Sequence, residues 1–319
     1  MAEDPLDSGD VDILLIFKKI FSIISLILLI FISMLFWFSK KIKRRIVNKS
    51  ILYLTMIEIG YLISVLLPYY INNPDSDLCF AESLLISFFS HARILWCFLM
   101  SYICIMESMN KLAFENHLLL FSIIFILTLI IIPLIPTLLI FFNRLSGNYG
   151  AYCFLPLNNE EMRYHIIRVH IFYTGVKFSF IIMTFYCIYQ SRKNKKLYHK
   201  KVGNYKSNHK YLNYPKLICC LQTLDIATNV YKIIFINSST FWIELAHLFL
   251  NCSEGIFIFI IFVRSTLFQT LFSRFYKNFK VKKRGNKKRN RNTFKSINDL
   301  INDKNTSPLI GRDSTADEN

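Results

Sequence analysis

The sequence has few charged residues for its length, and it lacks the marks of a soluble or secreted protein. Charged residues make up 18% of the 319 residues, whereas a soluble domain usually has about a quarter. The acidic start, followed by a long apolar run without a small-residue cleavage site, does not fit a secretory signal peptide. We also find no internal repeat and no separate soluble domain. These absences leave the apolar residues, 53% of the chain, as the main guide to the fold.

The apolar residues are gathered into blocks of about 20, the length an α-helix needs to cross about 30 Å of hydrocarbon. Each block is expected to be a helix, because isolated strands leave backbone groups unpaired in lipid. Seven blocks can be counted, at 20–39, 51–71, 79–106, 118–142, 165–190, 214–236 and 240–264. The sequence therefore predicts an all-α membrane protein, a seven-transmembrane helix bundle over residues 20–264. Residues 1–19 are expected to form a short extracellular tail.

The basic residues lie in alternate connections, and this pattern predicts the orientation. Residues 40–49 contain six Lys and Arg and residues 191–210 contain eight, whereas 72–77 and 237–239 contain none. Because basic connections stay in the cytosol, the N-terminus is expected outside and the C-terminus in the cytosol. Lys18 and Lys19 then lie on the outer side, where we expect them to snorkel to the interface. The net charge of +17 is thus attributed to topology, and no nucleic-acid partner is expected.

An amphipathic segment follows the seventh block. In residues 267–279 the apolar side chains fall on one helical stripe, away from Arg274 and Lys277. This pattern predicts an interfacial helix over residues 265–280, held at the inner membrane surface by anionic lipids. The basic and then polar residues 281–319 cannot form a core and are expected to be a disordered cytosolic tail.

Two of the eight cysteines lie at or beyond the outer ends of the predicted spans. Cys79 stands at the outer end of the third span and Cys153 in the loop after the fourth, both on the oxidising side, where disulfides persist. We expect a bond between them, because no third external cysteine competes; the alternative is two free thiols. The bond would tether the loop across the mouth of the bundle.

This order of parts resembles the G-protein-coupled receptor superfamily over about residues 12–280. The shared features are seven spans with the N-terminus outside, a Cys pair joining span three to the second outer loop, a basic third inner loop and an interfacial helix. The resemblance implies a plasma-membrane receptor that is not an enzyme and needs no cofactor or metal. Its implied partners are an extracellular small-molecule ligand, a heterotrimeric G protein and membrane lipids.

The motifs indicate a particular branch of that superfamily. Span three does not end in Asp-Arg-Tyr, and span seven has no proline, so the rhodopsin-like pattern is absent. Cys79 is instead followed after sixteen residues by Trp96, with an aromatic pair between them. Span seven carries Glu254-Gly255 where a Gln-Gly-Phe stretch is typical. These residues are most similar to the slime-mould cyclic-AMP-receptor-like branch and its secretin-like relatives.

Four ionisable residues are predicted at a similar depth inside the bundle, where such residues are costly and usually functional. At 1.5 Å per residue, Glu58, His91, Arg93 and Glu254 come to nearly the same level in spans two, three and seven. We expect an ion-pair network that joins Glu58, Arg93 and Glu254. Two roles remain open at this point, a contact that holds the resting state of a receptor and a static packing network.

A second polar set lies nearer the predicted outer side or the middle of the bundle. Lys232 and Arg168 would be the charge partners of a nucleotide or another phosphate ligand. The alternative is that both cations simply snorkel to the interface. The whole set, which could line a ligand pocket, is Arg168, Lys177, Asp225, Lys232, Glu244 and His247.

Three other function classes were weighed against the receptor. A seven-span transporter of a small solute is the main alternative; such proteins often contain broken helices, and Pro133 and Pro136 could break the fourth span. A metal-dependent intramembrane hydrolase needs several His or Asp at one depth, which the sequence does not place together. A retinal protein needs a lysine in the seventh span, and residues 240–263 contain none.

Overall fold

The fold is described from a computed structural model of the chain. It describes residues 8–37, 46–67, 77–109, 118–143, 147–149, 152–154, 163–202, 212–234 and 241–265, and five further residues between 268 and 276. Contacts divide the chain into two compact units, Met1–Gln269 and Thr270–Asn319. The helices, strands and polar contacts below belong to the first unit.

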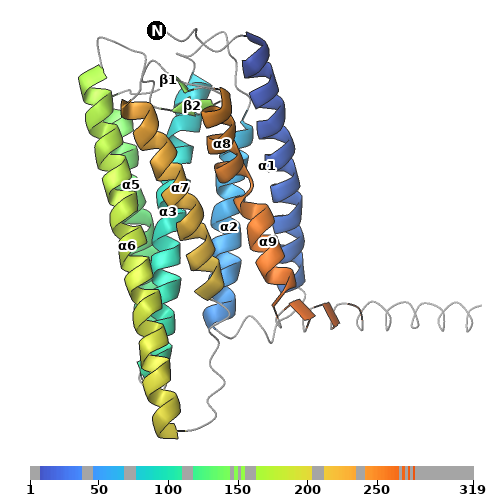
Figure 1. The fold of residues 1–319 in the computed structure, drawn as a ribbon, viewed down its shortest axis with the longest axis vertical. Coiled ribbons are helices and arrows are strands. Elements are labelled where there is room, and N and C mark those ends of the chain that lie inside the picture. The colour runs from blue at the N-terminus through green and yellow to red at the C-terminus, as the bar shows by residue number, and fades with distance from the viewer. Residues whose placement is uncertain are drawn as a thin grey trace, which may run out of the picture. The chain divides into compact units, whose positions relative to one another are not determined.

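The first unit is a helical bundle with one small hairpin at the end where α1 begins (Figure 1). Strand β1 (Gly147–Tyr149) pairs antiparallel with β2 (Tyr152–Phe154), and Asn148 lies opposite Cys153. The helices are α1 (Ser8–Trp37), α2 (Ile46–Leu66), α3 (Asp77–Met109), α5 (Leu118–Asn143), α6 (Arg163–Val202), α7 (Asn213–Ile234), α8 (Phe241–Cys252) and α9 (Glu254–Val263).

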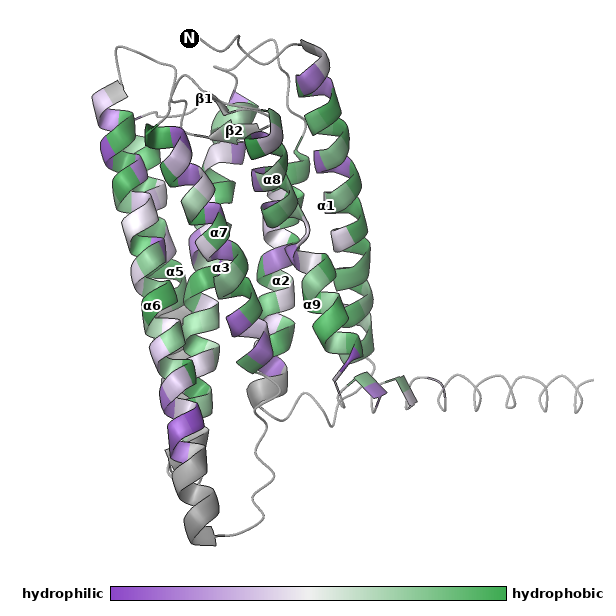
Figure 2. Cartoon of the chain, in the orientation of Figure 1, coloured by the Kyte–Doolittle hydropathy of each residue, from purple (hydrophilic) through white to green (hydrophobic). Residues whose placement is uncertain are grey.

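The helices are those of a membrane-embedded protein. Five of them, α1, α2, α3, α6 and α7, are long and apolar enough to cross a membrane, and the bent pair α8 and α9 makes a sixth candidate span. In α5 the apolar stretch Leu129–Asn143 is shorter than the 18 residues required of a candidate span. Figure 2 shows apolar residues along most of α1 and α9. Large apolar side chains stay exposed on the outer face of the bundle, as Ile27 and Ile182 do, which suits contact with lipid.

Helix α3 is the centre of the bundle. In its most apolar stretch 72% of the residues are buried, against 33% in α1 and in α6. It packs against α2, α5, α6, α7 and β2. A side chain that points inward from α3 therefore meets several other helices at once.

The last span is broken at Ser253, where α8 and α9 meet at an angle of 44°. The carbonyl oxygen of Cys252 accepts a hydrogen bond from Ser25 Oγ of α1 at 2.5 Å, and the Ser253 hydroxyl bonds back to the carbonyl of Phe249. Side chains that bond to the helix backbone in this way favour bends. Pro133 and Pro136, which could have broken the fourth span, do not do so, because α5 runs through both prolines without interruption.

Two other differences concern the ends of the bundle. Helix α1 begins at Ser8 rather than near Ile20, so residues 8–19 of the expected short tail are helical. Of the expected interfacial helix at 265–280, five residues are described as helical after Ser265, namely Phe268, Gln269, Phe272, Ser273 and Tyr276. Its other residues beyond Ser265, and the expected tail at 281–319, lie outside the described residues.

Candidate functional site

A disulfide joins the hairpin to the start of α3. Cys79, in the first turn of α3, is bonded to Cys153 of β2, and their Cα atoms are 5.2 Å apart. Both residues are buried. The bond fixes the segment between α5 and α6 against one end of the central helix.

A buried ion pair lies near this disulfide. Lys18 of α1 is 3.0 Å from Glu82 of α3, and both side chains are almost fully buried. The expectation that Lys18 snorkels to the interface is therefore wrong. Glu82 lies one turn beyond Cys79 and supplies a counter-charge, which makes burial of the lysine less costly than exposure of its ammonium to lipid.

Arg93 of α3 is the centre of a larger polar network. Its Nη1 donates a hydrogen bond to Glu254 Oε2 of α9 at 2.8 Å, and its Nη2 donates to Asn251 Oδ1 of α8 at 3.1 Å. The carboxylate of Glu58 on α2 lies 3.6 Å from Nη1. The guanidinium also stacks over the ring of Tyr61, 4.2 Å from its centroid. From α3, one cation thus contacts three other helices or half-helices, α2, α8 and α9.

A second branch of the network is built around Asp225 of α7. His247 Nε2 of α8 lies 2.8 Å from Asp225 Oδ1, and Lys177 Nζ of α6 lies 3.5 Å from Oδ2. Asn251 links the two branches, because its amide donates to Asp225 Oδ1 at 2.6 Å while its oxygen accepts from Arg93.

The network therefore connects six of the described helices. It includes side chains of α2, α3, α6, α7, α8 and α9, since Gln222 of α7 also donates to Glu254. The participating residues are buried, with exposed fractions of 6% or less for Glu58, Arg93, Lys177, Gln222, Asp225, His247, Asn251 and Glu254. Buried polar groups of this kind specify one arrangement of the helices, because a displaced helix leaves charges without partners.

The expected residues fall into separate places. Glu58, Arg93 and Glu254 come together, whereas His91 points elsewhere: its Nδ1 is 2.9 Å from the carbonyl of Ser87, and its ring packs edge-on against Tyr173. Tyr173 in turn lies beneath Lys177, 4.5 Å from the ammonium.

The expected ligand residues are also divided. Lys177 and His247 belong to the Asp225 branch, while Lys232 of α7 pairs with Glu244 of α8 at 2.7 Å. Arg168 is exposed on α6 and stacks over the ring of Tyr164. Five of the six residues in that set, including Asp225, are thus part of buried ion pairs, and Arg168 is not.

Several members of the network were missed from the sequence. None of Asn251, Gln222 and Tyr61 is among the residues that were expected from the sequence. A spacing signal was present: Asn251 is four residues after His247 and three before Glu254, and Gln222 is three before Asp225. Residues three or four apart share a helical face, so each missed residue lies beside an ionisable one.

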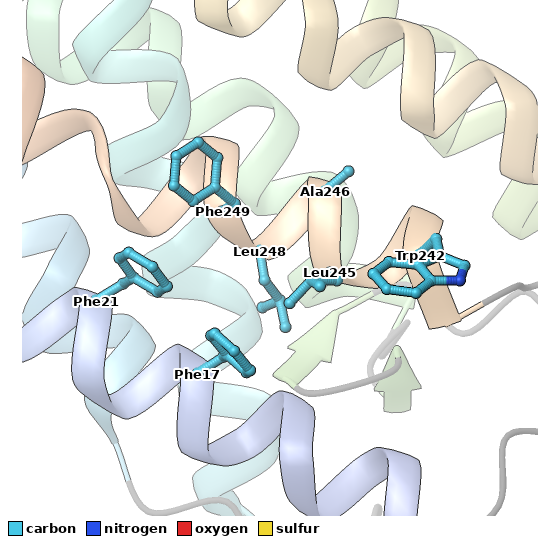
Figure 3. A pocket seen from close by; sticks show the side chains of 7 residues that line it. All are labelled: Phe17, Phe21, Trp242, Leu245, Ala246, Leu248 and Phe249. Carbon is cyan, nitrogen blue, oxygen red and sulfur yellow. The ribbon is translucent and has the colours of Figure 1, made fainter.

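A surface groove lies between α1 and α8, with a volume of about 310 Å³. Figure 3 shows its lining, which is apolar except for the indole nitrogen of Trp242 and contains none of the expected ligand residues. Such a groove suits hydrocarbon and offers no charged side chain to a charged ligand. The lining residues are Phe17, Phe21, Trp242, Leu245, Ala246, Leu248 and Phe249.

The comparisons with known proteins leave the family open. No protein-family model matches this chain, and no curated protein matches it. Within the described residues, no three His, Cys, Asp or Glu side chains gather closely enough to hold a metal ion. The arrangement is one of buried ion pairs and amides between helices, which suits mechanical coupling of the helices.

Proposed function

We propose that this chain is a seven-transmembrane G-protein-coupled receptor that passes the signal of an extracellular ligand to a heterotrimeric G protein. The observation that carries the proposal is the network around Arg93, which couples α2, α3, α7, α8 and α9 through buried charges. In this proposal the protein resides in the plasma membrane and catalyses no reaction.

The network suits a two-state switch for an energetic reason. Removing one partner of a buried pair leaves the other charge without a counter-charge in a low-dielectric interior, which costs about 3–5 kcal/mol. Small displacements of α7 or α8 therefore either leave all pairs intact or rearrange several of them together. A ligand that binds one arrangement more tightly shifts the population toward it.

The proposed topology has seven spans, with the N-terminus outside and the C-terminus in the cytosol. Seven passes result if α5, 26 residues long, is counted as a span and α8 with α9 as another. An odd number of passes agrees with the alternation of the basic connections. The Cys79–Cys153 bond supports the same orientation, since it would then lie in an oxidising compartment.

The proposed ligand site is the set of buried pairs at Lys177, Asp225, His247, Lys232 and Glu244. Each lysine there already has a carboxylate as its counter-charge. An anionic ligand such as a cyclic nucleotide must therefore displace a carboxylate, whereas a ligand with both charges can exchange with both members of a pair. The existing pairs of opposite charges therefore favour a zwitterionic small molecule over a phosphate as the ligand.

The experiment is a ligand panel on cells that express the full chain, read out as nucleotide exchange on the G protein. The panel includes cyclic nucleotides, amines and zwitterionic amino-acid derivatives, with mock-transfected cells as the control. Epitope tags on both ends test the topology in the same cells. The proposal fails if both tags lie in one compartment, or if neither the panel nor Arg93→Met changes nucleotide exchange.

The second candidate is a transporter of a small solute, and the break at Ser253 favours it. Transporters place substrate sites at discontinuous helices inside the membrane, and here the break lies between Asn251 and Glu254, both in the buried network. Solute uptake into vesicles that contain the purified chain would support this class, provided that Glu254→Gln abolishes it. Ligand-dependent nucleotide exchange without uptake would support the receptor.

A further inference from the structure

The centre of the network contains one carboxyl group more than its single cation can neutralise. Glu58 and Glu254 both face Arg93, which carries a single charge. Among the other charged groups of α1 and α3, Lys18 is committed to Glu82 at 3.0 Å. The helices described around α2 thus offer Glu58 no second cation.

The two carboxyl groups are held very differently. Glu254 accepts hydrogen bonds from Arg93 at 2.8 Å and from Gln222, so both of its oxygens have donors. Glu58 lies 3.6 Å from Arg93 Nη1, and neither of its oxygens has a hydrogen-bond partner in the described structure. Its side chain is fully buried. Glu254 is therefore held as the ionised partner of Arg93, and Glu58 is not.

A buried carboxylate without hydrogen bonds is far costlier than a neutral carboxylic acid in the same place, so such a group takes up a proton. We propose that Glu58 is a proton-binding site, and that it holds a proton while Arg93 is paired with Glu254. The ligand of this site is the proton itself, and the inference does not depend on whether the chain is a receptor or a transporter.

One other group in the network can supply the missing positive charge. His247 faces Asp225 at 2.8 Å, and Asp225 already has Lys177 at 3.5 Å. A proton on His247 would balance the network as a whole with three carboxylates ionised. That arrangement would, however, leave Glu58 ionised and without a hydrogen bond. Glu58 lies beside Arg93, and Arg93 and Asn251 separate it from the Asp225 branch that contains His247. The geometry at Glu58 favours the proton there.

The test is infrared spectroscopy on the purified full-length protein in lipid nanodiscs at neutral pH. A protonated carboxyl has a C=O stretching band that carboxylates lack, and the band shifts in D2O. We expect such a band in the wild type, its loss in Glu58→Gln and its retention in Glu244→Gln. A wild type without the band, or a band that persists in Glu58→Gln, overturns the proposal.

Thermal unfolding gives a second test of the proposal that does not depend on the infrared spectrum. Glutamine imitates a protonated glutamate, so Glu58→Gln is expected to keep the unfolding midpoint within about 2 °C of the wild type. Glu244→Gln is the matched control, because Glu244 lies 2.7 Å from Lys232 as an ionised partner, and it is expected to lower the midpoint by more. A drop for Glu58→Gln as large as that for Glu244→Gln overturns the proposal.

Discussion

Arg93 of α3 and Glu254 of α9 form an ion pair at 2.8 Å in which both side chains are fully buried. The two residues are 161 positions apart in the sequence. The pair therefore connects the central helix to the far side of the broken last span. Glu254 lies directly after the break at Ser253, so the pair also fixes where α9 begins.

Arg93→Met removes this pair and leaves Glu254 without its cation. We expect the free energy of unfolding in detergent to fall by about 3–5 kcal/mol, the cost of an unpaired buried charge. If the network holds the resting state, basal nucleotide exchange rises in cells that express the variant. The control is Arg168→Met, an exposed arginine on α6, for which about 0.5 kcal/mol or less is expected. Equal effects of the two substitutions would contradict a special role for Arg93.

Gly255 is a close-packed point between α9 and α1. A Cβ atom at this position would lie 2.8 Å from Ser25 Cβ and 3.0 Å from Leu29 Cδ1. Gly255→Ala is therefore expected to lower stability by about 1–3 kcal/mol through overpacking, despite the better helix propensity of alanine. The measurement is the midpoint of thermal unfolding.

Gly175→Ala is the matched control for that substitution. Gly175 lies on α6, and a Cβ atom there would meet nothing within 4 Å. Alanine should raise stability slightly at this helical position, by about 0.5–1 kcal/mol. If both alanine variants shifted the midpoint in the same direction, the contact of α9 with α1 would be looser than described.

The positions of the helices were largely predictable, because a membrane span needs a long apolar run. The third block was predicted at 79–106, and α3 covers Asp77–Met109. The start of α1 was missed, since Asp10, Asp12 and Lys18 lower the hydropathy of its first turns. What keeps Lys18 inside the bundle is Glu82, 64 positions away, and no local pattern reveals such a partner.

The polar network was predictable in depth but not in rotation. A rise of 1.5 Å per residue was enough to place Glu58, Arg93 and Glu254 at one level. His91 shares that level but stands two residues before Arg93, about 200° around the helix at roughly 100° per residue. It therefore meets Ser87 and Tyr173 instead of the carboxylates. The rotation of each helix depends on its neighbours, which a single sequence does not specify.

The Cys79–Cys153 bond closes a segment with a sequence separation of 74. Its removal is expected to cost roughly 4 kcal/mol, from the chain entropy of a loop of that size. The single variants Cys79→Ser and Cys153→Ser should lower the unfolding midpoint by similar amounts, and the double variant should add little. Cys220→Ser, at an exposed free cysteine, is the control. Additive losses in the double variant would show that the two cysteines act separately.

The pair of Lys232 and Glu244 can be tested as a pair by a double-mutant cycle. Lys232→Met alone leaves a buried carboxylate and is expected to cost about 3–5 kcal/mol, as is Glu244→Leu alone. The double variant replaces the pair by apolar groups and should regain most of the loss. If the stable double variant also loses its response to an activating ligand, the pair belongs to the ligand site as proposed. A normal response would remove both residues from that site.

A pair of cysteines offers a way to lock two helices of the bundle. Cys97 on α3 and Cys219 on α7 are buried free cysteines, and the two helices that carry them pack against each other. If signalling requires α7 to move away from α3, a disulfide between them holds the resting arrangement. A membrane-permeant mild oxidant, which accepts the two electrons of the new bond, should therefore abolish the ligand response, and a reductant should restore it.

The control for this crosslink is Cys219→Ser, which should respond equally before and after oxidation. Mass spectrometry of peptides must show the Cys97–Cys219 bond in the wild type, because Cys220, the next residue, is exposed and also oxidisable. A complete crosslink with an undiminished ligand response would mean that α3 and α7 stay together during signalling. The ligand signal would then have to pass through α8 and α9, which contact Arg93 from the other side.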